Sequence, residues 1–417
     1  MIQNFQEYIK NIDNISPQEK KDRERSLELF NKKGFPNKKL EEWKFTDIKK
    51  VIQQNFNELN PNNKLVKIKE INYIKDFEHN HILTINGNLY SHDFKYEDKD
   101  KVKIEKFKKE PGKNNNIDNS LLDLNDALFS GGYFLEVLEN YKLKKPLIIY
   151  NYFSNDIKNK IISNKNLIKL NKNSYTDLIE FSIDDSNDRF FYNNYTNIIL
   201  KNEATLKKYI IQSNKSKSVN YKFIKVFLEN NSNYESYIFS SGLEFNKIDK
   251  DIDVDGKNAL CTIQSSLLLN GNSHQEIKTK INHLKPNSKS FQKIKNVIND
   301  NCKAVYQGKI FVKDIAQKTD AYQLSKALIL KDKAEFNAKP ELEIYADDVK
   351  CSHGSTSGNI DDEAIYYLMT RGISRQEAIL LLTEAFLFEI FNSIENEDIK
   401  IFLEKSLKKQ IYEYKIN

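Results

Sequence analysis

The residues best suited to bind a metal are Cys351 and His353, which follow a long run of strand-like sequence. They stand two positions apart, so on an extended strand both side chains point to the same side. A thiolate and an imidazole on one face suit iron and copper as well as zinc. Two ligands do not complete a site, so a metal here needs others from elsewhere in the chain, from Asp347 or Asp348, or from another subunit. A half-buried cysteine and a hydrogen-bonded histidine at a strand end would give the same pattern without a metal.

The other histidines and cysteines are weaker candidates. His274 and His283 flank Glu276, and they either converge on a metal or lie on adjacent β rungs as ordinary polar residues. The three cysteines include no CxxC pair, which argues against a disulfide framework and a self-contained zinc site. Three more histidines lie in or near a turn-rich early strand, and we expect them to be on the surface: His79, His81 and His92. Two cysteines lie in apolar strand-like runs and are expected to be buried thiols: Cys261 and Cys302.

Several common catalytic motifs are absent from the sequence. The glycine-containing stretch Gly354–Asn359 lacks the lysine that a phosphate-binding loop needs at the start of a helix. The sequence also has no GxSxG elbow, no HExxH helix and no strand–GxGxxG–helix unit. We therefore expect that the chain neither hydrolyses nucleotides itself nor binds a nicotinamide.

Composition favours a soluble protein with a packed core. Hydrophobic residues make up 39% of the chain and charged residues 30%, which argues against wholesale disorder. The net charge of +6 comes from 65 basic and 59 acidic residues that are interspersed, unlike the basic surface of a nucleic-acid binder. No apolar run has membrane-spanning length, and the first residues lack the apolar region of a signal peptide. We therefore expect a cytoplasmic protein in a reducing compartment, with neither nucleic acid nor a membrane as partner.

The elements that must position these residues begin with a helical segment that extends to about residue 60. Ser16 can cap a helix that starts at Pro17 and ends at Gly34. A second helical segment is expected over Leu40–Phe56, where Trp43 would anchor it to the next domain.

A large β region follows, from about Ile68 to Tyr345. Short runs rich in Ile, Val, Tyr, Phe and Thr alternate there with clusters of Asn, Asp, Lys and Gly. A sandwich, a barrel and a parallel β-helix all fit this pattern, and no fixed repeat period chooses among them.

The last part of the chain is expected to be helical again. Asn359 can cap a first helix, and Gly372 is placed to end it in the left-handed conformation. Ser374–Glu377 forms a capping box for a second helix, and Ala378–Phe391 is apolar on nearly all sides. A final helix is expected to begin at Glu395 and to end in a lysine-rich turn.

Four stretches resemble the SufB/SufD family of iron–sulfur cluster assembly proteins. Asn337–Gly354 reads NAKPELEIYADDVKCSHG, and together with its continuation to Ile373 it is similar to the family signature. Glu41–Asp47, which reads EEWKFTD, resembles the N-terminal family segment, and Gly271–Glu276 resembles a stretch in the middle of the family core, as does Asn282-His283. Within the family, Gly354 resembles the SufD branch, since the SufB branch typically has Glu there.

The resemblance implies a fold: mainly β with α flanks, in which a right-handed parallel β-helix core lies between N-terminal and C-terminal helical domains. We place an N-terminal helical domain at residues 1–75, the β-helix core at 76–350, and a C-terminal helical domain at 351–417. The resemblance also implies a non-catalytic subunit of an ATP-dependent assembly complex.

The resemblance further implies partners and site residues. The chain would pair with a SufB-like paralogue, with a homodimer as an alternative in isolation, and a SufC-like ABC-type ATPase would dock on the C-terminal region. His353 would bind the nascent cluster or its iron at the interface, while the role of Cys351 is less defined. No cofactor would be held tightly in isolation, only a transient Fe–S cluster or iron shared with the partner. The residues expected to mark the ATPase-docking region are Tyr366, Tyr367, Arg371, Gly372 and Ile373.

Two other functions compete with the scaffold. A cytoplasmic β-helix enzyme acting on carbohydrate fits the strand pattern. This function leaves the C-terminal helices unexplained, however, and the sequence shows no clustered acidic site for such an enzyme. A stand-alone metal-binding protein would use His274, His283 and His353 together.

Overall fold

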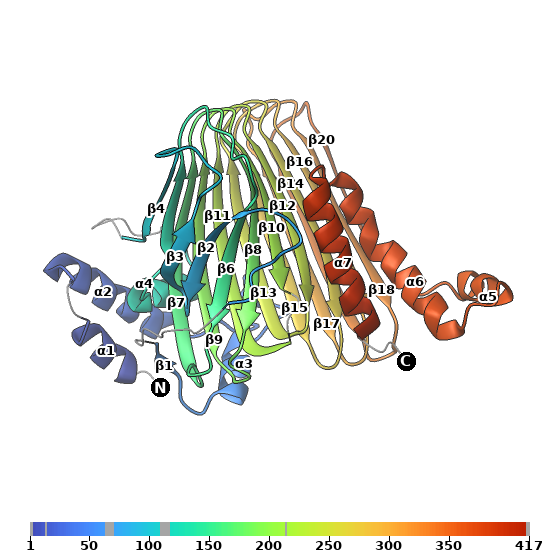
Figure 1. The fold of residues 1–417 in the computed structure, drawn as a ribbon, viewed down its shortest axis with the longest axis horizontal. Helices are drawn as coiled ribbons and strands as arrows, with labels where there is room; N and C mark the ends of the chain where they lie inside the picture. The colour runs from blue at the N-terminus through green and yellow to red at the C-terminus, as the bar shows by residue number, and fades with distance from the viewer. Residues whose placement is uncertain (1–2, 13–14, 63–70, 109–116, 213–214, 414–417) are drawn as a thin grey trace.

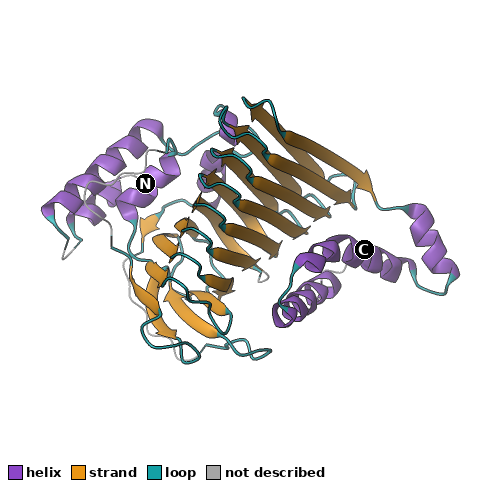
Figure 2. Ribbon diagram, turned by 90° about the horizontal axis from the view of Figure 1, so that it is seen from above, coloured by secondary structure: helices purple, strands orange, loops and turns teal. Residues whose placement is uncertain are grey.

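A parallel β-helix forms the centre of the molecule in the computed structural model, which describes residues 3–12, 15–62, 71–108, 117–212 and 215–413. Two ten-stranded sheets face each other, and the chain crosses from one to the other after nearly every strand (Figures 1 and 2). Each turn therefore adds one strand to each sheet, in parallel and in register with the strand before it. The fold prediction of a mainly β protein with α flanks and a parallel β-helix core is confirmed, although strand periodicity alone had left three architectures open.

The two sheets are named here by their strands. Sheet A contains, in spatial order from the N-terminal end, β4 (Val102–Lys106), β5 (Tyr133–Val137), β7 (Lys160–Leu170), β9 (Phe191–Leu200), β11 (Ser216–Leu228), β13 (Leu243–Val254), β15 (His274–His283), β17 (Lys303–Val312) and β19 (Glu335–Ile344), with β1 (Asn60–Pro61) beside β7. Sheet B contains β3 (Asn88–Asp93), β2 (Asn80–Ile85), β6 (Leu147–Phe153), β8 (Tyr175–Asp184), β10 (Thr205–Gln212), β12 (Asn233–Ser241), β14 (Leu260–Leu269), β16 (Lys289–Ile298), β18 (Asp320–Ile329) and β20 (Lys350–Asn359).

Asparagine shapes many of the corners between the sheets. Eight of the twelve described non-glycine residues with positive φ are asparagines, and asparagine tolerates the left-handed conformation better than most residues. Corner asparagines of successive turns also bond to each other, as Asn173 does to Asn140 and Asn258 to Asn231, both at 3.1 Å. Many of the asparagines in the sequence therefore have a structural role at the corners of the solenoid.

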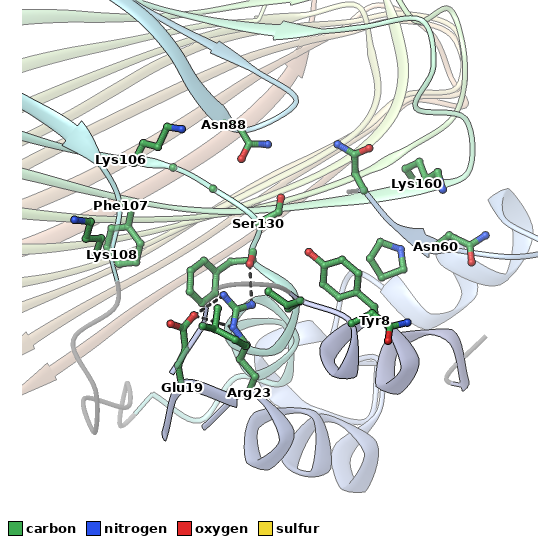
Figure 3. A pocket seen from close by; sticks show the side chains of 18 of the residues that line it. Tyr8, Glu19, Arg23, Asn60, Asn88, Lys106, Phe107, Lys108, Ser130 and Lys160 are labelled. Carbon is green, nitrogen blue, oxygen red and sulfur yellow. Dashed lines mark hydrogen bonds and ion pairs between the residues drawn. The ribbon is translucent and has the colours of Figure 1, made fainter. Parts of the chain in front are cut away.

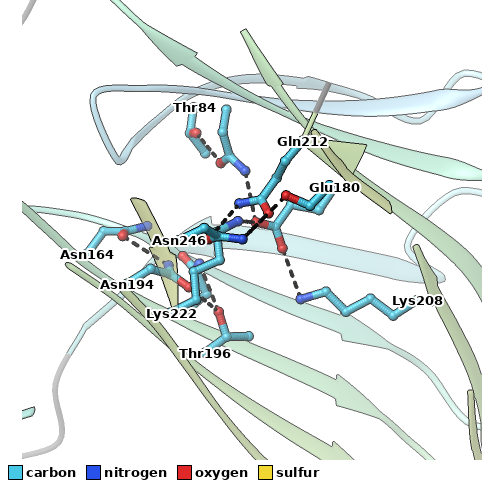
Figure 4. A network of polar contacts seen from close by, with 12 residues as sticks. Thr84, Asn164, Glu180, Asn194, Thr196, Lys208, Gln212, Lys222 and Asn246 are labelled. Carbon is cyan, nitrogen blue, oxygen red and sulfur yellow. Dashed lines mark hydrogen bonds and ion pairs between the residues drawn. The ribbon is translucent and has the colours of Figure 1, made fainter. Parts of the chain in front are cut away.

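The interior of the solenoid is apolar along most of its length but contains a buried charge cluster (Figure 4). Glu180 forms ion pairs with Lys208, at 3.1 Å, and with Lys222. Burial alone would raise the pKa of Glu180, but the Lys222 and Lys208 ammonium groups outweigh it and hold this pKa at about 2. Lys250 lies in the same interior and donates to Ser236 Oγ at 2.7 Å.

Helices from the N-terminal part cover the outer face of sheet A. Trp43 is 3% exposed and lies against Tyr221, with ring centroids 5.6 Å apart, so its predicted anchoring role is confirmed. Ser16 caps the second helix and Gly34 ends it, also as predicted. The expected helix over 40–56 is instead a short 3-10 turn followed by a helix that Asp47 caps. The helices are α1 (Gln3–Lys10), α2 (Pro17–Lys33), η1 (Glu41–Trp43), α3 (Ile48–Asn55) and α4 (Ser120–Leu128), which the sequence did not predict.

The C-terminal helices lie on the outer face of sheet B, except the first, which projects beyond the solenoid (Figures 1 and 2). Ser374 and Glu377 form the predicted capping box, and Gly372 has a φ of 86°. The first helix is capped by Asp361 rather than by Asn359, because β20 runs through Asn359. The helices are α5 (Asp362–Thr370), α6 (Arg375–Phe388), η2 (Glu389–Ser393) and α7 (Glu397–Glu413).

The last strand also bears on the predicted domain boundaries. β20 spans Lys350–Asn359 and pairs with β18 along its whole length, so the boundary that we placed after residue 350 falls inside a strand. Cys351 and His353 thus lie in the solenoid sheet and not in the helical segment. None of the helices among the described residues is long and apolar enough to span a bilayer.

Candidate functional site

Cys351 and His353 point toward the interior side of the last solenoid turn. On the neighbouring strand β18, Cys351 pairs with Ala321 and His353 pairs with Gln323. Both partners are buried, Ala321 among the apolar residues of the interior and Gln323 against Tyr306. Paired residues of parallel strands share a face, so the structure places the thiol and the imidazole side by side, as their spacing predicts.

The last turn is open, because β19 and β20 are the end strands of their sheets. His353 is exposed there, and its imidazole makes no hydrogen bond with the described residues. Cys351 is half-buried beside the apolar interior, and this burial raises the pKa of its thiol. The alternative of a hydrogen-bonded histidine at a strand end is thus not what the structure shows.

The site is incomplete within this chain. Asp347 and Asp348 are exposed in the loop before β20, where the backbone N–H of Asp348 donates to Gln317 Oε1 at 2.9 Å. Among the described residues, no group of three or more His, Cys, Asp or Glu side chains is placed to hold a metal ion. A thiol and an imidazole at an open edge can supply two ligands, and the rest must come from a partner or from the cargo.

His274 and His283 do not meet, although both lie on β15. They occupy its two ends, and nine residues of strand correspond to about 30 Å. His274 lies on the outer face, where its Nε2 is 2.8 Å from Thr46 Oγ1. His283 is buried between two hydroxyl groups, Ser288 Oγ at 2.7 Å and Ser290 Oγ at 2.9 Å. The hypothesis of a metal site that combines these two histidines with His353 is therefore wrong.

The burial of His283 predicts an acid-dependent loss of stability. Burial lowers the pKa of His283 to about 4. In the unfolded chain the imidazole is protonated below about pH 6.5, so the folded state loses up to about 3 kcal/mol as the pH falls from that value toward 4. We expect the free energy of unfolding in urea to be lower for His283→Gln than for wild type at neutral pH. Near pH 4.5 this difference in free energy should become smaller or change sign. An equal difference at both pH values would contradict a neutral buried imidazole.

The remaining candidates divide between surface and interior. His92 is exposed, as expected, but His79 and His81 are half-buried against Tyr150, with His79 Nε2 at 2.9 Å from its hydroxyl. The surface prediction for these two is wrong because the segment before β2 folds onto sheet B. Both interior cysteines are confirmed as buried, and burial raises the pKa of Cys261 to about 12.

The residues expected to mark the ATPase-docking region divide in two. Tyr366 and Tyr367 are 69% and 57% exposed on α5. Arg371 lies over the Tyr367 ring, 5.2 Å from its centroid, and donates to its hydroxyl at 3.1 Å. Gly372 provides the left-handed turn that ends α5, and Ile373 packs into the core between the helices and sheet B. The first three can contact a partner, whereas Gly372 shapes the turn and Ile373 contributes to the core.

Family models cover nearly the whole chain. The model described as "SUF system FeS cluster assembly, SufBD core domain" matches residues 152–386, more than half of the sequence, and "SufBD protein N-terminal region" matches residues 1–149. The chain belongs to the SufBD family. The core match includes β20, and with it Cys351 and His353.

Individual relatives match shorter stretches. The iron–sulfur cluster assembly protein SufD of Escherichia coli is 40% identical over 147 residues, which is 35% of each chain. The SufD of Bacillus subtilis is 25% identical over 322 residues, or 76% of this chain and 70% of the relative. The chloroplastic protein ABCI7 of Arabidopsis thaliana is 27% identical over 272 residues, which covers 57% of that protein. The first of these matches thus spans about a third of the relative's length.

In this SufBD family member, the segment Glu41–Asp47 lies across the outer face of sheet A, as the anchoring role predicted for Trp43 implies, but its polar contacts were not predicted. Glu41 bonds to Lys339 on β19 at 2.5 Å, and Glu42 pairs with Lys278 on β15 at 2.9 Å. Thr46 bonds to the buried Glu276, whose pKa is held below its usual value by Lys247 despite burial. For the contact between Thr46 and Glu276, the sequence indicated only that both residues lie in stretches that resemble the family.

The backbone does not by itself require glycine at position 354. A Cβ placed on Gly354 would lie 3.2 Å from Leu324 Cδ1, the end of a flexible side chain, and Gly354 is not among the glycines with positive φ. A residue with a side chain could therefore occupy position 354 if the Leu324 side chain shifts slightly.

Proposed function

We propose that the chain is a non-catalytic scaffold subunit of an ATP-dependent complex that builds iron–sulfur clusters, with the nascent cluster as its cargo. It pairs with a SufB-like paralogue through the open turn formed by β19 and β20, and a SufC-like ATPase docks on its C-terminal helices. The observation that carries the proposal is His353 at that open turn of a SufBD-family core, exposed and without a hydrogen bond to the described residues.

The open turn supports pairing with a chain of the same fold. An edge strand presents unpaired backbone N–H and C=O groups, which another strand can extend. Exposed aromatic residues lie nearby: Tyr345 is 62% exposed, and Phe291 and Tyr322 stack on the outer face of sheet B with centroids 5.8 Å apart. Apolar groups beside an unpaired edge favour a specific interface over an edge left in water.

The chemistry of the two side chains assigns them different parts in binding the cargo. The exposed imidazole of His353 can offer a nitrogen to iron without losing an existing hydrogen bond. The Cys351 thiol is half-buried beside apolar side chains, so iron has less access to it than to the exposed imidazole. His353 is therefore the more accessible ligand of the two, and a cysteine of the paralogue would complete the site.

The C-terminal helices connect the proposed ATPase surface to sheet B. Ser266 Oγ donates to the Leu387 carbonyl at 2.9 Å, and Lys293 pairs with Glu389, also at 2.9 Å. A partner that moves Tyr366 and Tyr367 on α5 would pull on helices packed against the same sheet that ends in β20. This supports ATP-driven distortion of the open turn as the step that opens the interface with the paralogue, so that iron and sulfur can reach Cys351 and His353.

Co-expression with a SufB-like paralogue and a SufC-like ATPase tests the proposal. We expect a tagged form of this chain to co-purify both partners from the same cells. A double variant, Tyr366→Ser with Tyr367→Ser, should retain the paralogue and lose most of the ATPase, because the exposed rings contribute to contact and not to folding. A matched control, Tyr90→Ser, removes an exposed tyrosine at the far end of the solenoid and should keep both. Recovery of the chain without either partner would contradict the scaffold.

A further inference from the structure

A cavity of about 1080 Å³ lies at the end of the solenoid opposite to β20. Its walls come from α1, from β1 and from the first strands of both sheets, including β3, β4 and β7. Figure 3 shows Tyr8, Asn88, Lys106 and Ser130 around the same open space. The proposed scaffold function uses none of these residues.

Hydrogen-bond donors without partners gather in this cavity. The ammonium groups of Lys106 and Lys160 form no ion pair with the described residues, and the Tyr8 hydroxyl forms no hydrogen bond with them. The amide nitrogen of Asn62 is buried and has no hydrogen-bond partner in the described part of the chain. A buried donor without an acceptor is unfavourable, so the wall gains stability when an acceptor atom arrives.

The charge balance of the lining favours an anion. Among the described residues, four basic side chains and two acidic ones line the cavity. One of the acids, Glu19, is neutralised by Arg23 at 2.9 Å, and Arg23 also donates to the carbonyl oxygen of Phe129 at 2.8 Å. Arg23 and Glu19 thus belong to the scaffold of the cavity, and the three lysines among the described lining residues outnumber the remaining acid, Glu7.

We propose that the cavity is a second binding site, which takes an organic anion bearing phosphate or carboxylate groups. The anionic oxygens lie against Lys106 and Lys160 and accept from Tyr8 and Asn62, since charge-assisted hydrogen bonds are the strong ones. The carbon part of the molecule lies against Phe107 and its apolar neighbours in the wall. The volume suits a molecule of drug or nucleotide size.

The test titrates the purified full chain with inorganic pyrophosphate and, separately, with citrate, and follows binding by calorimetry. We expect saturable binding of at least one anion, and the stronger of the two identifies phosphate or carboxylate as the preferred group. The double variant Lys106→Gln with Lys160→Gln should weaken that binding by about tenfold or more, since it removes two charge-assisted hydrogen bonds. Tyr8→Phe, which keeps the ring, should weaken it by a smaller factor.

A matched double variant at the other end of the solenoid, Lys331→Gln with Lys333→Gln, removes two exposed charges and should bind as wild type does. Thermal unfolding of every variant shows whether it is folded. The proposal is overturned if neither anion binds saturably, or if Lys106→Gln with Lys160→Gln retains wild-type affinity. Co-purification of the partners is a separate readout, so failure of this site leaves the scaffold proposal untouched.

Discussion

In the co-expressed complex, His353→Ala should leave the subunits assembled but reduce the cluster that accumulates on them by more than about tenfold, because losing a direct ligand costs more than losing an outer one. The exposed imidazole makes no hydrogen bond with the described residues, so its removal should not disturb the fold. The measurement is the visible absorbance of the cluster, with iron and sulfide content, on the complex purified without oxygen.

Two further variants serve as a control and a comparison for His353→Ala. His92→Ala removes an exposed histidine near the opposite end of the solenoid and should leave cluster content unchanged. Cys351→Ser should reduce cluster content by less than His353→Ala, since this thiol is half-buried and less accessible to the cluster than the exposed imidazole. Wild-type accumulation of cluster on the His353→Ala complex would remove His353 from the site.

The second large effect concerns stability: Glu180→Gln should lower the free energy of unfolding by about 3 to 5 kcal/mol. Glu180 is 5% exposed and pairs with two lysines that are themselves buried, Lys208 and Lys222. Removing the carboxylate that Lys208 and Lys222 share leaves their two ammonium groups in the solenoid interior without this counter-ion. Urea unfolding at neutral pH measures the change.

The same ion pairs predict how acid acts on the fold. The pKa of Glu180 is depressed to about 2, so its stabilising contribution is complete above the unfolded value near 4.5 and is lost as the pH falls toward 2. Glu180→Gln should lack this part of the acid dependence. Glu229→Gln is the control, because its pair with Lys201 is more than a third exposed and should be worth less than about 1 kcal/mol. Equal losses in the two variants would contradict a buried charge cluster.

Local signals predicted local structure well. Ser16, Gly34, Gly372 and the Ser374–Glu377 capping box all act as their residue types indicate. These signals depend on a few neighbouring residues, so the sequence contains all of the information. The β-helix itself came from family resemblance, because inward-facing residues such as Lys208 break the apolar alternation that would otherwise mark each strand.

The candidate site was predictable only in part. The spacing of Cys351 and His353 placed both on one face, which is a property of any strand. That β20 ends its sheet, and so leaves His353 open, depends on how the whole solenoid stacks. Two further features also depend on the whole fold. One is the contact of Thr46 with Glu276, which lie 230 residues apart in sequence. The other is the placement of His274 and His283 at opposite ends of one strand.

The central claim is that His353 binds the nascent cluster in the assembled complex, and one spectroscopic measurement tests it most directly. This chain is labelled with ¹⁵N-histidine, combined with unlabelled partners, loaded with cluster and reduced to a paramagnetic state. Pulsed electron paramagnetic resonance then detects nitrogen coupled to the cluster. We predict that the coupling changes from ¹⁴N to ¹⁵N when this chain alone is labelled. Identical spectra for the labelled and unlabelled chain would contradict it, because none of its six histidines would then be a ligand.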